Sequence, residues 1–349
     1  MNKESGEPIP FSSVLSALQN ASVPFPARYL RSFSDLPPAN LKVLLNCWPS
    51  IPARRKVSLL EDLEAVLEED TLVNFDNLAR ALLADPDPHV RTCALRLLWE
   101  CEEKSILPIL VDISIKDEDE TTRETAISLL GKFVLLGELD SLKDSAKEGL
   151  NQHLVNIVRG KDKTRVKQRA LESLGYSSHP AVPDLIRNAY QTNDLHWVTS
   201  AICAMGRSAD DAWGPQVVAM LTSPEPEIQF EAIRAAGELE LRTAREPLLA
   251  LLEEETEDEE MRLALIWALS QIGGDAVREK LNELLENPSN EDEAEWLEKA
   301  MENLDISTPG DMNLLDFSPG DEEDDEEEDF LGDLELDDFN AEDEEEEDE

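Results

Sequence analysis

The sequence predicts an all-α fold, a right-handed α-solenoid built from stacked helix pairs. The main observation is a pattern that occurs six times between about residue 85 and residue 273: a polar turn, then a small apolar anchor, then Leu-Gly or a relative of it. The anchors fall at positions 94, 126, 170, 201, 232 and 265, so they are separated by 32, 44, 31, 31 and 33 residues. A period of this size fits two helices and two turns, which is typical of a helical repeat array.

Residues 1–72 are expected to contain a disordered start, up to about residue 9, and then an irregular helical cap. Three helices are predicted in the cap. Phe11–Leu18 is amphipathic, Pro38 can start a helix that runs to Cys47, and Pro52 can start one that runs toward Glu68. Such a cap keeps the apolar face of the first repeat away from water.

Residues 73–304 are predicted to hold about seven helix pairs. Leu78–Leu83 and Val90–Trp99 form the outer and inner helices of the first pair, and residues 276–285 and 291–304 form the last. Prolines lie 13 to 15 residues past four of the anchors, where each is expected to start an outer helix, because the first helical turn leaves its N–H groups unbonded. These prolines are Pro108, Pro183, Pro215 and Pro247.

Three further features of the repeat lead to predictions. Five of the six residues that lie nine positions before the anchors can accept hydrogen bonds from free N–H groups at a helix start; the six are Asp85, Asp117, Lys161, Thr192, Ser223 and Thr256. Glycines five positions past four anchors are expected to let neighbouring helices approach closely; they are Gly131, Gly175, Gly206 and Gly237. The long interval between positions 126 and 170 predicts a lengthened outer helix or an added loop at about residues 138–150.

Residues 305–349 are predicted to be a disordered acidic tail. They contain 24 of the 78 acidic residues and no Lys or Arg, and such a segment cannot bury enough apolar surface to fold alone. The whole chain has a net charge of −47, which disfavours nucleic acid and anionic membranes as partners, because both attract cations. A basic protein surface remains open as a partner.

Several other classes of function lack their sequence signals. No leader and no run of about 18 apolar residues is present, so a soluble, cytoplasmic protein is expected. Metal-ligand spacings such as Cys-x-x-Cys and His-x-x-x-His, and the glycine-rich loops of nucleotide sites, are absent from the sequence. We therefore predict no catalytic residue, no metal, no cofactor and no small-molecule ligand. The four cysteines are expected to be core residues in a reducing compartment.

Two segments carry a pattern that can be compared with known repeats. They are Asp85-Pro86-Asp87-Pro88-His89-Val90-Arg91 and Ala268-Leu269-Ser270-Gln271-Ile272-Gly273-Gly274. The block from Asp85 to Gly274 resembles the HEAT family, in the short bacterial form named after phycobilin-lyase subunits. The resemblance implies the armadillo-like helical superfamily and about seven HEAT-like helix pairs. Members act as scaffolds, adaptors, regulatory subunits and, less often, enzymes, so the resemblance is informative about fold rather than function.

One enzyme with this repeat, deoxyhypusine hydroxylase, binds two irons through His-Glu dipeptides. This chain has four histidines and no His-Glu pair, so the resemblance does not extend to that iron site. The fourth repeat departs most from the family pattern, with Trp197-Val198 where the others have an apolar residue followed by a basic or polar one.

A basic segment is the first candidate for binding. Its six bases within eleven positions are Arg159, Lys161, Lys163, Arg165, Lys167 and Arg169, opposed only by Asp162. One interpretation is a solvated turn and helix start, with Lys167 at the usual Arg position of the repeat. The other is a docking site for the acidic tail or an anionic partner, which would need several weak surface pairs acting together.

Apolar residues in the acidic tail are the second candidate. They are Leu314, Leu315, Phe317, Phe330, Leu331, Leu334 and Phe339. Alternation of acidic and apolar residues is often found in disordered segments that bind the groove of a partner. The alternative is a solubilising, repelling tail in which these residues are incidental.

A third candidate is the group formed by His196-Trp197 and residues 207–213. It can form part of a recognition surface. Alternatively its tryptophans pack between repeats and Asp210 or Asp211 caps a helix.

These observations favour a non-catalytic scaffold or adaptor that binds a protein through the solenoid, with the tail adjusting affinity. A chaperone-like binder of a basic protein, acting through the polyanionic tail, is the alternative from a different class. A lyase or other enzyme subunit is a third.

Overall fold

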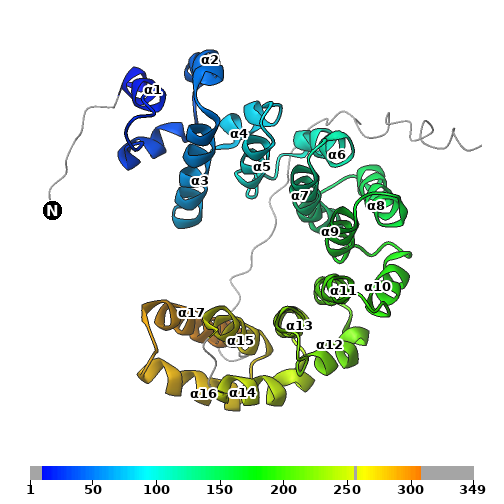
Figure 1. Ribbon diagram of the computed structural model, residues 1–349. Coiled ribbons are helices and arrows are strands. Elements are labelled where there is room, and N and C mark those ends of the chain that lie inside the picture. Colours follow the sequence, from blue (N-terminus) through cyan, green and yellow to red (C-terminus); the bar gives the residue numbers. More distant parts are fainter. Residues whose placement is uncertain (1–9, 255–257, 308–349) are drawn as a thin grey trace, which may run out of the picture. The chain divides into compact units, whose positions relative to one another are not determined.

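The computed structural model describes residues 10–254 and 258–307, and Figure 1 shows them as a succession of α-helices. Those ranges contain no β-strand, so the all-α prediction is confirmed for them. From α4 to α17 the helices follow one another as seven successive pairs in the described chain, in agreement with the predicted number. The predicted disordered start and the predicted tail beyond Ser307 lie outside the described residues.

The described chain falls into two compact units. The first comprises the residues up to Phe133 together with Lys161–Val166, and the second comprises residues 134–160 and those from Lys167 onward. Helix α7 (Glu120–Glu138) and helix α9 (Thr164–Leu174) each contribute residues to both.

The first unit begins with the region predicted to be a cap. It contains α1 (Phe11–Gln19), α2 (Pro38–Cys47) and α3 (Ala53–Glu69), which match the three predicted helices closely, and the short 3-10 helices η1 (Ala27–Phe33) and η2 (Trp48–Ser50). Helix α3 packs directly against α5, as one inner helix packs against the next. The predicted cap therefore ends in a helix that takes part in the stack.

Helix pairs complete the first unit and build the second. The first unit continues with α4 (Asp76–Leu82), α5 (Pro88–Arg96), α6 (Leu107–Lys116) and most of α7. In the second unit the outer helices are α8 (Asp144–Arg159), α10 (Val182–Tyr190), α12 (Gly214–Met220), α14 (Arg245–Glu253) and α16 (Asp275–Glu286). The inner helices are α9, α11 (Leu195–Arg207), α13 (Pro226–Glu238), α15 (Glu259–Ile272) and α17 (Glu291–Ser307). Helices α11, α13, α15 and α17 pack consecutively (Figure 1).

Prolines and glycines hold the predicted places in the repeat. A proline is the second residue of α6, α10 and α12 and the third residue of α14, so each lies in a first turn. A Cβ atom added to Gly175, Gly206 or Gly237 would lie 2.8 Å from the Cα of an alanine on the next inner helix. These three glycines therefore set the close spacing of α9, α11, α13 and α15, as predicted.

The prediction of helix caps nine positions before the anchors was wrong. Asp85, Asp117 and Ser223 accept hydrogen bonds from backbone N–H groups two residues later, inside the turn and before the helix begins. The residues that cap the inner helices lie seven positions before the anchors, and Asp87, Asp119, Asp194 and Asp258 accept from N–H groups of the first turn. The turn is two residues longer than the helical pattern alone indicated.

The long interval between positions 126 and 170 lengthens two successive helices, the inner helix of one pair and the outer helix of the next. Outer helix α8 has 16 residues, and inner helix α7 has 19. The lengthened outer helix was predicted, whereas the lengthening of α7 was not. At the other end of the chain, α17 continues to Ser307, three residues past the predicted end of the helices.

Candidate functional site

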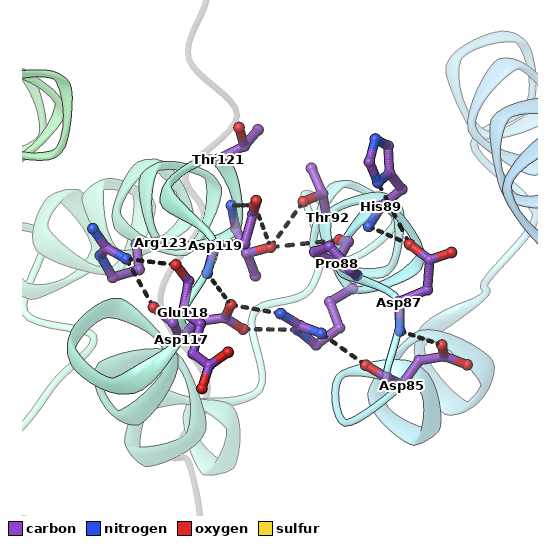
Figure 2. Close-up of polar contacts among 12 residues, drawn as sticks. Asp85, Asp87, Pro88, His89, Thr92, Asp117, Glu118, Asp119, Thr121 and Arg123 are labelled. Atoms are coloured by element: carbon purple, nitrogen blue, oxygen red, sulfur yellow. Dashed lines mark hydrogen bonds and ion pairs between the residues drawn. The ribbon is translucent and has the colours of Figure 1, made fainter. Parts of the chain in front are cut away.

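A ladder of buried ion pairs runs through the turns of the first unit (Figure 2). Asp85 accepts hydrogen bonds from the Trp48 indole at 2.7 Å and from the Lys56 ammonium at 3.1 Å. The Arg91 guanidinium donates both to the Asp85 carbonyl and, in a bidentate pair at 2.6 and 2.7 Å, to the Asp117 carboxylate. These charged groups already have partners within the fold, so the ladder stabilises the stack and offers no free site.

The next step of the ladder reaches the basic segment. Arg123 donates to the Asp117 carbonyl at 2.8 Å and to the Asp162 carboxylate at 2.9 Å. The side chains of Arg123 and Asp162 are 11% and 28% exposed. The one acidic residue of the basic segment is therefore occupied by a cation from another helix, and it does not neutralise its neighbours along the chain.

The structure places the six predicted basic residues at the turn between α8 and α9. Arg159, Lys161, Lys163 and Arg165 are exposed, whereas Lys167 and Arg169 are half-buried. Arg169 forms an ion pair with Glu172. The other five bases form no ion pair with any residue in the described ranges.

The lack of a partner for Lys167 follows from the repeat. Arg91, Arg123 and Arg262 hold the same position, three before the anchor, and each pairs with a carboxylate of the following repeat. Asp117 is that partner for Arg91, but the corresponding position after Lys167 holds Thr192. Lys167 thus takes the usual Arg position, as one interpretation of the sequence had it, without the ion pair that the position makes elsewhere.

A second group of charged residues lies on the inner helices of the second unit. We call it the inner-face cluster, and it comprises Arg169, Glu172, Arg207, Glu231, Arg234 and Glu238. Glu172 accepts a hydrogen bond from the Ser200 hydroxyl at 2.8 Å, and its backbone carbonyl accepts one from Arg207 at 3.0 Å. The Arg207 guanidinium lies 5.1 Å from the centre of the Tyr176 ring. Polar contacts therefore join α9 and α11, and within α13 Arg234 pairs with Glu231 and Glu238.

The carboxyl groups of the inner-face cluster lie in a poorly solvated setting. Burial raises the pKa of Glu231, which Arg234 lowers and the Glu172 carboxylate raises further. Burial also raises the pKa of Glu238, against the effect of Arg234, whose guanidinium lies 3.3 Å away. Opposite charges held at low solvation interact more strongly with an arriving charge than fully solvated ones do.

Two tryptophans extend this face toward the end of the chain. Trp267 of α15 is half-buried, and its ring would be 2.7 Å from a Cβ atom at Gly237 of α13. Trp296 of α17 is 38% exposed, and the Lys299 ammonium lies 5.9 Å from its ring centre. Neither tryptophan was proposed as a site residue from the sequence. The signal that points to Trp267 is its position within the repeat, two past its anchor, where Glu172 and Arg234 lie in their repeats.

The third candidate group divides between the two interpretations. Trp213 is buried, and Asp210 caps the short 3-10 helix η4 (Asp211–Trp213) by accepting from the Ala212 N–H. The packing and capping interpretation is therefore correct for these two residues. His196 is exposed and lies 3.8 Å from Glu227, and Trp197 is half-buried. Arg207, from the same group, belongs to the inner-face cluster.

The apolar residues of the tail, from Leu314 to Phe339, lie outside the described residues. Cys93, Cys101 and Cys203 are buried, and burial raises the pKa of each thiol. Across residues 10–254 and 258–307, no group of three or more His, Cys, Asp or Glu side chains is arranged to hold a metal ion. No helix in these ranges combines the length and the apolar character needed to cross a membrane.

A comparison with protein-family models assigns the repeats. The model for HEAT repeats matches residues 75–152 and 214–302. The chain is a HEAT-repeat protein. The two matches enclose α9, α10 and α11, whose pairing and glycine spacing continue the repeat between them. The match does not distinguish the phycobilin-lyase-like form, which stays a prediction from the sequence.

Solved structures similar to this HEAT-repeat protein include natural and designed proteins. YibA of Escherichia coli is 17% identical, with 80% of this chain and 96% of that chain covered and a TM-score of 0.40. Human deoxyhypusine hydroxylase in complex with glycerol is 18% identical, with 85% and 96% covered and a TM-score of 0.35. A designed armadillo repeat protein in complex with a (KR)4 peptide is 16% identical, with 57% and 99% covered and a TM-score of 0.37. A search of curated protein sequences returns no match.

Proposed function

We propose that this HEAT-repeat protein is a non-catalytic scaffold or adaptor that binds a protein partner along the inner helices of its second unit. The inner-face cluster carries the proposal. It places three arginines on one face with Tyr176, Trp267 and Trp296, and these are the residue types that supply most of the binding energy in protein interfaces.

The side chains of the inner-face cluster are already ordered. Arg169, Arg207 and Arg234 are each held by an intramolecular carboxylate or carbonyl, so little side-chain entropy is lost when a partner arrives. The alternation of arginine and glutamate suits a partner with both signs of charge. It also suppresses wrong partners, because like charges brought together are costly.

The acidic tail is proposed to modulate this binding. Its apolar residues Leu314, Leu315, Phe317, Phe330, Leu331, Leu334 and Phe339 would contact the partner, and its carboxylates would steer a basic surface toward the array. Replacing Leu315, Phe317, Phe330 and Phe339 together by alanine should lower partner binding if these contacts form. Unchanged binding would leave the tail with a purely electrostatic role.

The test is affinity purification from lysate of the source cell. Full-length protein is compared with a chain ending at Ser307, the last helical residue, and with the full-length variant Trp296→Ala/Lys299→Glu. Both substituted residues are exposed, so the fold should tolerate the changes. Ile109→Ala, on outer helix α6 and 45% exposed, is the matched control.

The proposal is supported if full-length protein, the chain ending at Ser307 and the control all capture the partner, and the Trp296 variant captures about tenfold less or lower still. That result would favour the inner helices as the binding face. Equal capture by the Trp296 variant and the control contradicts it.

The composition of the tail favours one second candidate, a chaperone-like binder of a basic protein. Residues 305–349 contain 24 acids and no base. In this function basic proteins are held only by the full-length chain and are released as salt rises, because exposed charges are screened beyond about 8 Å at physiological ionic strength. A packed groove on the inner helices keeps its partner at the same salt concentration.

A further inference from the structure

The turn before α9 reverses the charge of the repeat. Seven positions before the anchors the inner-helix repeats have Asp87, Asp119, Asp194, Glu225 and Asp258, and this repeat has Lys163. Nine positions before, Asp85 and Asp117 correspond to Lys161. Both positions therefore change from an acidic or polar acceptor to an ammonium group, which can only donate hydrogen bonds.

The reversal removes the capping carboxylate seven positions before the anchor, and the Lys163 N–H at the start of α9 donates instead to Asp162, at 2.6 Å. In four of the six repeats with an anchor, the inner helix starts at an aspartate that accepts from first-turn N–H groups, whereas Lys163 offers no acceptor. The first turn of α9 contains no acidic residue, and Arg165 lies in it. Basic residues at a helix N-terminus are unfavourable, because the unpaired N–H groups there already carry partial positive charge. This turn is less stable than its counterparts unless an anion covers it.

The cations of the turn are available for such an anion. Lys161, Lys163 and Arg165 belong to the first unit and are all exposed. Asp162 between them is bonded to Arg123 at 2.9 Å. In a chain with 78 acidic and 31 basic residues, three neighbouring bases without a carboxylate partner among the described residues are an exception.

We propose that Lys161, Lys163 and Arg165 dock the acidic C-terminal segment of the same chain, residues 308–349. Charge complementarity is one reason, since 23 acidic residues and no base lie in this segment. Proximity along one chain is the other, since a tethered segment is present at an effective concentration of roughly millimolar without a second molecule. The inference rests on the proposed role of the tail as a modulator and identifies where the tail is held.

The first experiment is zero-length carboxyl–amine crosslinking of the full-length protein at low and at moderate salt, read by mass spectrometry. An equal mixture of isotope-labelled and unlabelled chains separates links within a chain from links between chains. We expect links from Lys161 and Lys163 to carboxylates of residues 308–349, within one chain and lost at moderate salt. Lys42, which is exposed and forms no ion pair in the described chain, is the internal control.

The second experiment uses the variant Lys161→Asp/Lys163→Asp, which gives both positions the aspartates of the first two repeats and should stabilise the start of α9. Removal of the tail by a glutamate-specific protease is timed on the intact protein at low salt. The variant should lose the tail roughly threefold faster or more, since a few exposed pairs are broken. Lys42→Asp/Arg54→Asp makes the same change in net charge at exposed positions away from the turn.

Links confined to pairs of chains, no links from Lys161 or Lys163 at low salt, or equal cleavage of the two double variants would each overturn the proposal. The proposed scaffold function is judged separately by partner capture, which the Trp296→Ala/Lys299→Glu variant tests without altering the turn.

Discussion

Asp85 and Asp117 show how much one residue of the repeat does. In each residue the carboxylate accepts one hydrogen bond from the backbone N–H two residues later and another from a cationic side chain of another helix. The backbone carbonyl of the same residue accepts a hydrogen bond from an arginine. The Asp117 side chain is 7% exposed and that of its partner Arg91 is 15% exposed. Removing one member of such a pair leaves the other charge buried without a counter-ion.

We expect Asp117→Ala to lower the free energy of unfolding by about 3 kcal/mol or more, because the Arg91 guanidinium loses its bidentate partner. Urea denaturation measures the change. Asp112→Ala, which breaks the exposed pair with Lys116 on the same helix, should cost less than about 1 kcal/mol. Similar losses for both variants would mean that the ladder is no more stabilising than a surface pair.

His153 should make stability depend on pH. Burial lowers the pKa of this residue from 6.5 to about 4. Above pH 6.5 both folded and unfolded states are neutral at this site, and as the pH falls toward 4 only the unfolded state takes up the proton. Stability therefore decreases across this window by about 3 kcal/mol in total, and the contribution becomes constant below it.

The measurement is urea denaturation of the wild type and of His153→Gln at pH 7.5, 6.5, 5.5 and 4.5. The difference between the two should change with pH, since it isolates His153 from the titrating carboxylates. His89→Gln, which removes an exposed imidazole, is the control for loss of a histidine outside the core. A difference independent of pH would show that His153 is protonated equally in both states.

At the scale of helices, the distance between neighbours depends on single missing side chains. Gly206 and Gly149 are both helical glycines, but a Cβ atom at Gly206 would lie 2.8 Å from the Ala235 Cα, and one at Gly149 would meet nothing within 4 Å. The contrast separates a glycine that packing requires from one that it does not.

Gly206→Ala should destabilise the fold by about 1–3 kcal/mol, because the added methyl group forces α11 and α13 apart. Gly149→Ala should instead stabilise it by up to about 1 kcal/mol, since alanine favours the helix more than glycine does. Thermal unfolding of the two variants tests both signs. A gain in stability from both would mean that the inner helices can shift without cost.

At the scale of the whole molecule, charge has opposing effects. Ion pairs join successive turns, while a net charge of −47 repels itself. The long-range repulsion is screened by salt, whereas the buried pairs of the ladder are screened much less.

We therefore expect the melting temperature to rise by about 2 °C or more when NaCl is raised from low to moderate concentration. Differential scanning fluorimetry of the full-length protein and of the chain ending at Ser307 measures this. The shorter chain carries fewer acids and should respond less. A melting temperature that falls with salt would show that the ion pairs outweigh the repulsion.

The all-α class, the positions of nearly every helix and the close contacts at Gly175, Gly206 and Gly237 could be predicted from the sequence alone. These are set by local properties, namely period, proline and missing side chains, which recur at fixed spacing in each repeat. The basic segment was also visible, because its residues adjoin one another along the chain.

Which charged side chains are paired and which are exposed depends on how the helices stack. Three contacts join residues about 30 or more positions apart in the sequence. Arg123 pairs with Asp162, α3 packs against α5, and Arg207 donates to the Glu172 carbonyl. The inner-face cluster could not be predicted for the same reason. Arginine and glutamate are common on solvated helices, and burial against a neighbouring repeat, which raises the pKa of Glu231 and Glu238, exists only once the helices are stacked.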